Sequence, residues 1–351
     1  MFTKIRCPLL VLAIGFILSH GVTPLTAQEP PYKGKTIRMI AGFPPGGGVD
    51  AEARLLARYL ERHIPGRPTV VVQNMPGAGG LVATNWFEQF AKPDGLFLHY
   101  TSTSSMTQQV LGVEEVRFDL RGWEVIGGVR RGGSVAVIRQ ERLERLTAPG
   151  KPLAIGTRGG DESWNAIFLW GAELLKWNVR WIMGYPGSGD LRLALQREET
   201  DIFATAVLPT LRELMTAGFH PFVQQGSLTP SGSFQRRPEF SKVSTFEEIL
   251  GPRRPTGAPW QAYISWAGVD SAGRPLYAPP RTPPEVVRVL REAFSQTRDD
   301  TEFKSDLKRV AGEDAELLLA NEAEPILRQL LSVTPEVRDF ANGLMKKYLK
   351  R

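Results

Sequence analysis

Short apolar runs alternate with amphipathic segments along the first third of the chain, and this alternation predicts strands followed by helices. Buried strands are predicted at 36–43, 68–74 and 96–101, and helices with one apolar face at 51–63 and 81–91. Each strand runs into a Gly-rich or Ser-rich loop. Repeated strand–loop–helix units are typical of a parallel sheet with crossover helices, whose loops gather where open α/β sheets bind ligands.

The second half of the chain repeats this pattern. Further strands are predicted at 153–157, 179–183, 201–205, 220–223 and 261–270. Helices are predicted at 164–175, at 191–197, in a segment that ends at 217, and at 245–250, within a Pro-, Gly- and Ser-rich stretch at 224–260. Four helical segments follow at 284–298, 301–311, 323–331 and 335–349. We therefore predict an α/β protein.

The first 27 residues are predicted to be a secretory signal peptide rather than part of the folded protein. Lys4 and Arg6 precede an apolar run at 8–18, and a polar lead ends at Ala27, the expected cleavage position. The run is too short to span a membrane comfortably, although an uncleaved anchor is the alternative. Cys7 is the only cysteine and lies in this segment, so the mature chain is predicted to have no disulfide. We expect a soluble protein exported to the periplasm.

The length of 351 residues suggests about two domains, and 42% apolar with 23% charged residues is ordinary for a globular protein. The net charge of +6 is mild, and no dense basic block is present. We predict that the pairs Arg130-Arg131, Arg236-Arg237 and Arg253-Arg254 lie in solvated loops. Nucleic-acid binding is therefore disfavoured.

Two glycine-rich bends follow consecutive strands, "FPPGGG" at 43–48 and "PGAGG" at 76–80, with a weaker example at 184–190. A bend of this kind that opens a helix turns several backbone N–H groups toward one point, and the helix terminus adds a partial positive charge. Such a site binds an anion without a basic side chain. Tight turns and close packing are the alternative reading, but two bends in consecutive units favour binding of a small carboxylate.

The sequence contains few candidates for catalytic residues. The nucleotide patterns GxGxxG and GxxxxGK, the GxSxG elbow and the metal pattern HExxH are absent, and His63, His99 and His220 are expected to be structural. We therefore predict no enzyme activity, no metal and no cofactor. The tryptophans are expected in the core, except that Trp164 directly follows the loop "RGGDES", where it could cap a pocket.

Several segments resemble the extracytoplasmic solute-binding receptors of tripartite tricarboxylate transporters, the Bug family. They are "IRMIAGFPPGGGVDAEARLLARYL", "VVVQNMPGAGGLVA", "KPDGLFLHYTSTSS" and "MGYPGSGDLRLALQREETDIFAT", and the likeness runs over about 32–348. The resemblance implies a two-lobed type 2 periplasmic-binding-protein fold, each lobe a mostly parallel sheet flanked by helices. It implies one lobe at 32–133 plus 265–351 and another at 134–264, which close around a ligand by hinge motion.

The resemblance also implies the ligand-binding residues. The first bend would contribute Phe43, Pro44, Gly46, Gly47 and Gly48, the second Ala78, Gly79 and Gly80, and the third loop Ser102, Thr103 and Ser104. The second lobe would contribute Thr157, Arg158, Asp161, Tyr185, Gly187, Ser188 and Thr205. Thr205 stands where many members carry an Asp that binds an amino group, which disfavours an amino-acid ligand. Arg158 either pairs a second ligand carboxylate or is closed off by Asp161 and Glu162.

The expected function is capture of a small organic carboxylate, such as a di- or tricarboxylate, for the permease subunits of a tripartite tricarboxylate transporter. We expect a monomer. A ligand-loaded sensor that docks on a membrane signalling partner is the alternative, and a small-molecule enzyme on the same scaffold is a third interpretation.

Overall fold

The computed structural model describes residues 32–229 and 231–349. The predicted signal peptide, with Cys7 and the expected cleavage after Ala27, lies outside the described residues. Among the helices of the described part, none combines the length and the apolar character that crossing a membrane requires.

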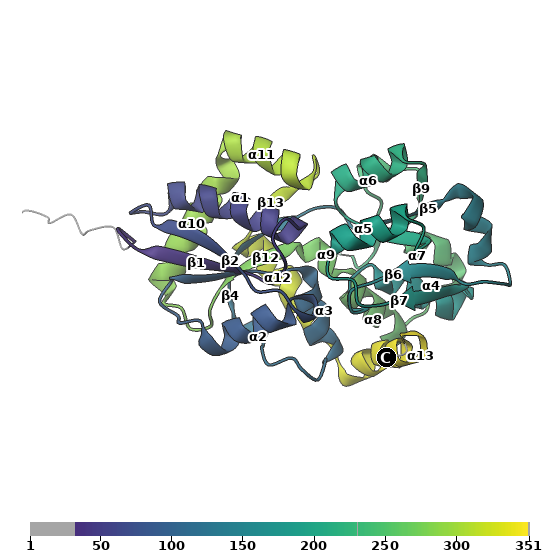
Figure 1. Ribbon diagram of the computed structural model, residues 1–351. Helices are drawn as coiled ribbons and strands as arrows, with labels where there is room; N and C mark the ends of the chain where they lie inside the picture. The colour runs from purple at the N-terminus through teal and green to yellow at the C-terminus, as the bar shows by residue number, and fades with distance from the viewer. Residues whose placement is uncertain (1–31, 230, 350–351) are drawn as a thin grey trace, which may run out of the picture.

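A six-stranded sheet forms the first half of the molecule (Figure 1). Its strands, in spatial order, are β13 (Glu316–Leu319), β4 (Glu124–Arg130), β12 (Arg274–Ala278), β3 (Phe97–Tyr100), β1 (Thr36–Ala41) and β2 (Thr69–Asn74). Strand β1 pairs in parallel with β2 and β3, as the repeated strand–loop–helix units predict, whereas β12 lies antiparallel between β3 and β4. The loops after β1, β2 and β3 therefore lie at one edge of this sheet.

A five-stranded sheet forms the second half. Its strands, in spatial order, are β7 (Val179–Ile182), β6 (Leu153–Gly156), β8 (Ile202–Thr205), β5 (Val135–Arg139) and β9 (Phe219–Gln224). Strands β6, β7 and β8 are parallel, and β5 runs antiparallel to both of its neighbours. Figure 1 shows the two sheets side by side, each with its own helices.

Helices cover both faces of each sheet because successive strand residues point to opposite sides. On the first sheet, Leu276 of β12 packs beneath α1 (Gly48–His63), α10 (Pro284–Asp299) and α11 (Thr301–Ala311). Its neighbour Tyr277 packs with the helices of the other face, which are α2 (Leu81–Phe90), α3 (Thr103–Leu111), α9 (Val269–Ala272) and α12 (Ala320–Leu331). The second sheet is covered by α5 (Ser188–Gln196) and α6 (Leu208–Thr216) on one face and by α4 (Asn165–Leu175), α7 (Phe246–Leu250) and α8 (Ala258–Ala267) on the other.

The last helix, α13 (Pro335–Tyr348), packs with the second sheet, although the predicted division places residues up to 351 in lobe one. Val337, Ala341 and Leu344 are buried in the core formed with α4 and α8. The helix also touches the first half, because Arg338 donates to the Val110 carbonyl (3.2 Å) and Asn342 to the Leu111 carbonyl (2.9 Å) at the end of α3. The division into lobes at 32–133 plus 265–351 and 134–264 remains a prediction.

The predicted strand at 261–270 is wrong, because the segment forms α8 and α9. Helix α8 is buried on several sides, so its apolar residues do not show the one-sided pattern by which an amphipathic helix is recognised. The rings of Trp260, Tyr263 and Trp266 recur every three residues along one side of α8, and Pro259 occupies its first turn, where a missing N–H costs nothing. Strands β4, β5, β12 and β13 have no counterpart in the sequence prediction.

Two helical glycines provide a test of packing in the second half. A Cβ on Gly171 in α4 would collide with the buried indole of Trp177, whereas a Cβ on Gly343 in α13 would meet no atom within 4 Å. We expect Gly171→Ala to lower the free energy of unfolding by about 1–3 kcal/mol through overpacking. Gly343→Ala should raise it by about 0.5–1 kcal/mol through helix propensity. Chemical denaturation of both variants measures the difference, and a Gly171→Ala protein as stable as the parent would contradict this packing.

Candidate ligand-binding site

A cleft of about 600 Å³ lies between the two sheets and is lined from both sides. A volume of this size suits a small organic molecule. The predicted site residues that line it are Phe43, Pro44, Gly46, Gly47, Gly48, Ser102, Thr103, Arg158, Gly187, Ser188 and Thr205. Trp164, expected to cap a pocket, also lines the cleft.

Two helix N-termini reach the cleft from opposite sides. Helix α1 begins at Gly48, three residues earlier than predicted, and its N-cap Gly47 makes no side-chain capping bond. Helix α5 begins at Ser188 behind Gly187, which likewise makes none. The first-turn N–H groups of a helix have no carbonyl of their own helix to bind. Both ends therefore present unpaired donors and partial positive charge toward the same space.

The first-turn acid of α1 is turned away from the cleft. Asp50 is buried, accepts the Gly46 N–H at 2.9 Å, and is also bonded to Arg54 and Asn74. Burial alone would raise the pKa of Asp50, but these hydrogen bonds and the Arg54 charge lower it. Its carboxylate thus fixes the bend at Gly46, which has a φ of +81° that favours glycine. Gly46, Gly47 and Gly48 themselves line the cleft.

Arg158 lies in the cleft and bridges its two sides. Its guanidinium lies over the Phe43 ring, 5.1 Å from the centroid, and donates to the Ser104 hydroxyl at 3.1 Å. Glu162 accepts both the Arg158 Nε–H (3.1 Å) and its backbone N–H (2.7 Å). Of the two roles considered for Arg158, the structure shows the internal ion pair with Glu162, while part of the guanidinium still faces the cleft.

The second glycine bend does not line the cleft. Gly80 lies against the Phe43 ring, and the site of a Cβ on Gly79 is 3.1 Å from Gln108 Nε2 and 3.4 Å from an Asp161 oxygen. Gln108 also donates to the Ala78 carbonyl at 3.1 Å. The bend is covered by side chains from α3 and from the loop after β6, a contact that no local sequence pattern reveals. Ala78, Gly79, Gly80 and Asp161 therefore form a contact between the two halves.

Asp161 and Glu162 are adjacent, buried carboxylates with opposite tendencies. Burial, followed by the charge of Glu162, raises the pKa of Asp161 to about 6. Burial would also raise the pKa of Glu162, but the Arg158 charge and hydrogen bonds from Thr157 and Arg158 lower it. Asp161 accepts a 2.5 Å bond from Gln108, and its other oxygen has no partner among the described residues. The protonated form of Asp161 therefore suits this contact better than the ionised form.

A buried ion-pair cluster lies at the base of the cleft. Glu52 of α1 is bonded to Arg131, to Arg274 at 2.8 Å, and to the Tyr100 hydroxyl. Burial alone would raise the pKa of Glu52, but the charges of Arg131 and Arg274 and the hydrogen bonds hold it at about 2. Both arginines also line the cleft. This cluster was not predicted from the sequence, because Arg131 was expected in a solvated loop and Glu52 was given no role.

Asp270 of α9, a helix that packs on the first sheet, is a further buried acid near the base of the cleft. Its two oxygens accept hydrogen bonds from Ser134 (2.9 Å) and Ser163 (2.6 Å), and all three residues line the cleft. Burial raises the pKa of Asp270. Asp270 lies in the short helix α9, whereas Ser134 and Ser163 lie in loops, so no local sequence motif brings the three residues together.

The remaining predicted residues support the site from behind. Thr157 is fully buried and donates to Glu162, Ser104 is bonded to Arg158, and Tyr185 packs beside Gly156. Ser102 both lines the cleft and caps α3, accepting the Ser104 N–H at 3.2 Å.

Arg237, like Arg131, was expected in a solvated loop but is buried. Arg237 is only 1% exposed and donates to Asp314 at 2.6 Å and to the carbonyls of Gly133 and Ala206. Asp314 also accepts the Gly132 N–H at 3.1 Å. The segment that joins β4 to β5 is thus held by hydrogen bonds from Gly132 to Asp314 and from Arg237 to Gly133.

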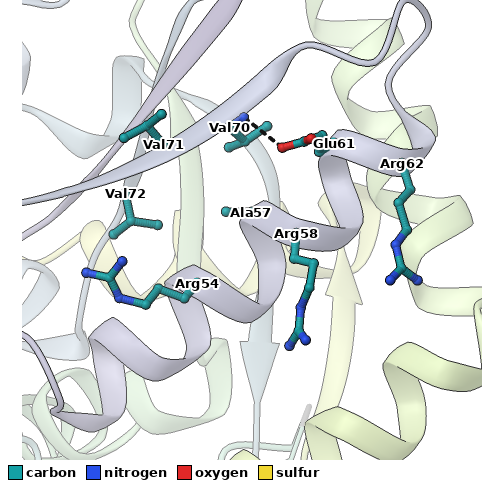
Figure 2. Close-up of a pocket in the computed structure, with 8 residues that line it drawn as sticks. All are labelled: Arg54, Ala57, Arg58, Glu61, Arg62, Val70, Val71 and Val72. Atoms are coloured by element: carbon teal, nitrogen blue, oxygen red, sulfur yellow. Dashed lines mark hydrogen bonds between the residues drawn. The ribbon is translucent and has the colours of Figure 1, made fainter.

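A second hollow, of about 510 Å³, lies between α1 and the edge strand β2 (Figure 2). Arg54, Arg58 and Arg62 follow one another along the helix, but each is paired with an acid of the protein, namely Asp50, Asp306 and Glu302. Glu61 accepts the Val70 N–H, which covers part of the strand edge. None of the predicted site residues lies here, so the interlobe cleft is the better candidate.

The part of the chain that the structure describes contains no group of three or more His, Cys, Asp or Glu residues arranged to hold a metal. His99 is buried and contacts the Ile40 carbonyl and Thr84. Burial lowers its pKa to about 4. His99 is therefore a core residue, as expected from the sequence.

No model of a protein family matches the chain. Among curated proteins, Protein BugT of Bordetella pertussis is 43% identical over 98 residues, which cover 27% of this chain and only 28% of BugT. The UPF0065 protein in the gbd 5' region of Cupriavidus necator is 26% identical over 303 residues, 83% of each chain.

Solved structures share the fold. The periplasmic binding protein BugD superposes with a TM-score of 0.63 at 21% identity, over 91% of this chain and 98% of BugD. MatC from Rhodopseudomonas palustris with bound malate gives 0.62 at 19% identity, over 88% and 99%. An R. palustris protein with adipate gives 0.66 at 16% identity, over 88% and 97%. The chain thus has the two-lobed fold of periplasmic binding proteins.

The buried Asp161 predicts a pH-dependent stability. Its folded pKa of about 6 lies above the ordinary value of 3.8, so its contribution to stability is fullest below 3.8 and is lost as the pH rises toward 6. Asp161→Asn should therefore stabilise the protein by about 2–3 kcal/mol above pH 6. The gain should shrink as the pH falls from 6 to 4. Thermal denaturation across this range measures it.

Asp299→Asn serves as the control, because Asp299 is exposed at the end of α10. Its difference from the parent should be small and independent of pH over the same range. A pH-independent difference for Asp161→Asn would show that Asp161 does not titrate in this contact.

Proposed function

We propose that the chain is an extracytoplasmic solute-binding receptor of the Bug type, which captures a small organic carboxylate in the periplasm and delivers it to a membrane transporter; its similarity to BugT, to the UPF0065 protein and to the fold of BugD supports this. The chain would act as a monomer whose two lobes close around the ligand, and its partner would be the permease subunits of a tripartite tricarboxylate transporter. We infer a binding role and no catalytic one.

The observation that carries this proposal is the pair of helix N-termini, α1 and α5, that line one cleft from opposite sides. An anion between them would accept main-chain hydrogen bonds from both halves. Each charge-assisted bond contributes about 1.5–3 kcal/mol. Because the donors come from both sides, ligand binding would favour the closed arrangement over the open one.

The names of the similar proteins support the same ligand class. MatC was solved with malate and the other R. palustris protein with adipate, and both compounds are dicarboxylates. The cleft volume of about 600 Å³ is ample for molecules of that size. Delivery to a membrane partner would require surfaces on both lobes, which closure would bring into a fixed relation.

Gly47→Asp tests the proposed cradle. Gly47 has a φ of −81°, and a Cβ there would meet only the Pro44 carbonyl, at 3.6 Å, so the fold should tolerate the side chain. A carboxylate at this position would repel the ligand anion and compete for the amides. Binding of mono-, di- and tricarboxylates should fall at least tenfold, measured by calorimetry after a thermal-shift screen.

Gly122→Asp provides the matched control, since a Cβ on Gly122 meets no atom within 4 Å and the residue does not line the cleft. That variant should bind as the parent does. Undiminished binding by a folded Gly47→Asp protein would exclude the α1 terminus as the cradle.

A further inference from the structure

We propose that Arg274, with Arg131 behind it, is a ligand-binding residue that makes a mixed site of guanidinium and main-chain amides for one carboxylate of the ligand. This inference rests on the proposed function and assigns a charged determinant to the same cleft. It differs from the glycine-bend cradle because the main attraction comes from side-chain charge.

Arg274 lies beside the N-terminus of α1. The site of a Cβ on Gly48 is 3.5 Å from Arg274 Nη1 and 3.9 Å from Nη2. An oxyanion that accepts the first-turn N–H groups of α1 would therefore lie within reach of the guanidinium. A guanidinium fork matches the planar carboxylate group, and the helix terminus adds its own donors.

Both Arg274 and Arg131 have guanidinium N–H groups for which the described residues provide no acceptor. The hydrogen bond that Arg274 makes within the described residues runs from Nη1 to Glu52, which leaves Nη2 and Nε for the cleft. Arg131 also donates to Glu52, but its Nε is buried without a partner, and the residue is only 8% exposed while lining the cleft. A buried donor without a partner, in a residue that lines the cleft next to Arg274, is a feature that a bound anion would explain.

The charged residues at the base of the cleft also favour an anionic ligand. Two guanidinium groups share the single carboxylate of Glu52, and the charge of Arg274 also interacts with Asp270. Asp270 is the other acid near Arg274, but its oxygens are taken up by Ser134 and Ser163, and it forms no ion pair within 4 Å among the described residues. Tyr100 is held as a neutral donor to Glu52, because burial and the Glu52 charge raise its pKa. A bound carboxylate would therefore supply the guanidinium groups with the direct acceptor that Asp270, which is bonded to the two serines, does not supply.

The experiment compares the binding of acids with that of their uncharged amides, on the parent protein and on its variants. The probes are succinate and succinamide, adipate and adipamide, and benzoate and benzamide. For an acid that binds the parent, Arg274→Gln should weaken binding at least tenfold and should reduce the preference for the acid over its amide by a similar factor. Arg274→Lys should recover part of both. Arg130→Gln is the control, because Arg130 pairs with Glu316 at the surface, outside the cleft.

The double variant Arg274→Gln with Glu52→Gln guards against misfolding, because it removes the acid that Arg274→Gln would leave short of a partner. It should fold and show the same loss of acid preference. Acid binding within twofold of the parent in either folded variant would overturn the inference while leaving the proposed function intact. If none of these acids, nor citrate, binds the parent, the proposed function itself fails.

Discussion

The carboxylate of Glu52 is the contact on which the arrangement of the cleft depends. It belongs to α1, and it binds Arg131 on the segment that leaves the first sheet, Arg274 at the start of β12, and Tyr100 at the end of β3. A buried acid of this kind is stable only while its cations stay in place. It therefore fixes the N-terminus of α1 relative to the segment about which the two lobes would move.

The two halves meet through polar contacts of different character. Arg237 and Asp314 brace the segment between β4 and β5 with an ion pair in which Arg237 is fully buried. At the other end of the cleft, Asp161 meets Gln108 and Gly79 through one short hydrogen bond with unpaired atoms around it. The first contact is a buried ion pair with further hydrogen bonds, whereas the second rests on one hydrogen bond beside an unpaired carboxylate oxygen, so the second would be the easier one to break.

Local chemistry made much of the fold predictable, and contacts between distant segments made the rest unpredictable. Strands β1, β2, β3, β6, β7 and β8 and helices α1, α2, α4, α5 and α6 fall close to the predicted positions, because apolar runs and glycine bends mark them locally. The segment 261–270 was wrongly predicted as a strand, because a helix buried on many sides has no one-sided apolar period in its sequence. The first bend was placed in the cleft, but the second is covered by Gln108, which lies 30 residues from Ala78. Arg131 and Arg237 looked like surface residues because nothing in their neighbouring sequence records the acids they meet.

Helix α13 gives the molecule a third tether between its halves. Besides the segment between β4 and β5 and the return into β12, the chain passes from α12 to α13, which packs on α4 and α8 while Arg338 and Asn342 hold the end of α3. Two covalent crossings allow one body both to bend and to twist against the other. A third crossing at α13, set apart from these two, would restrict the twist and would leave bending about one axis as the easier motion between the two halves.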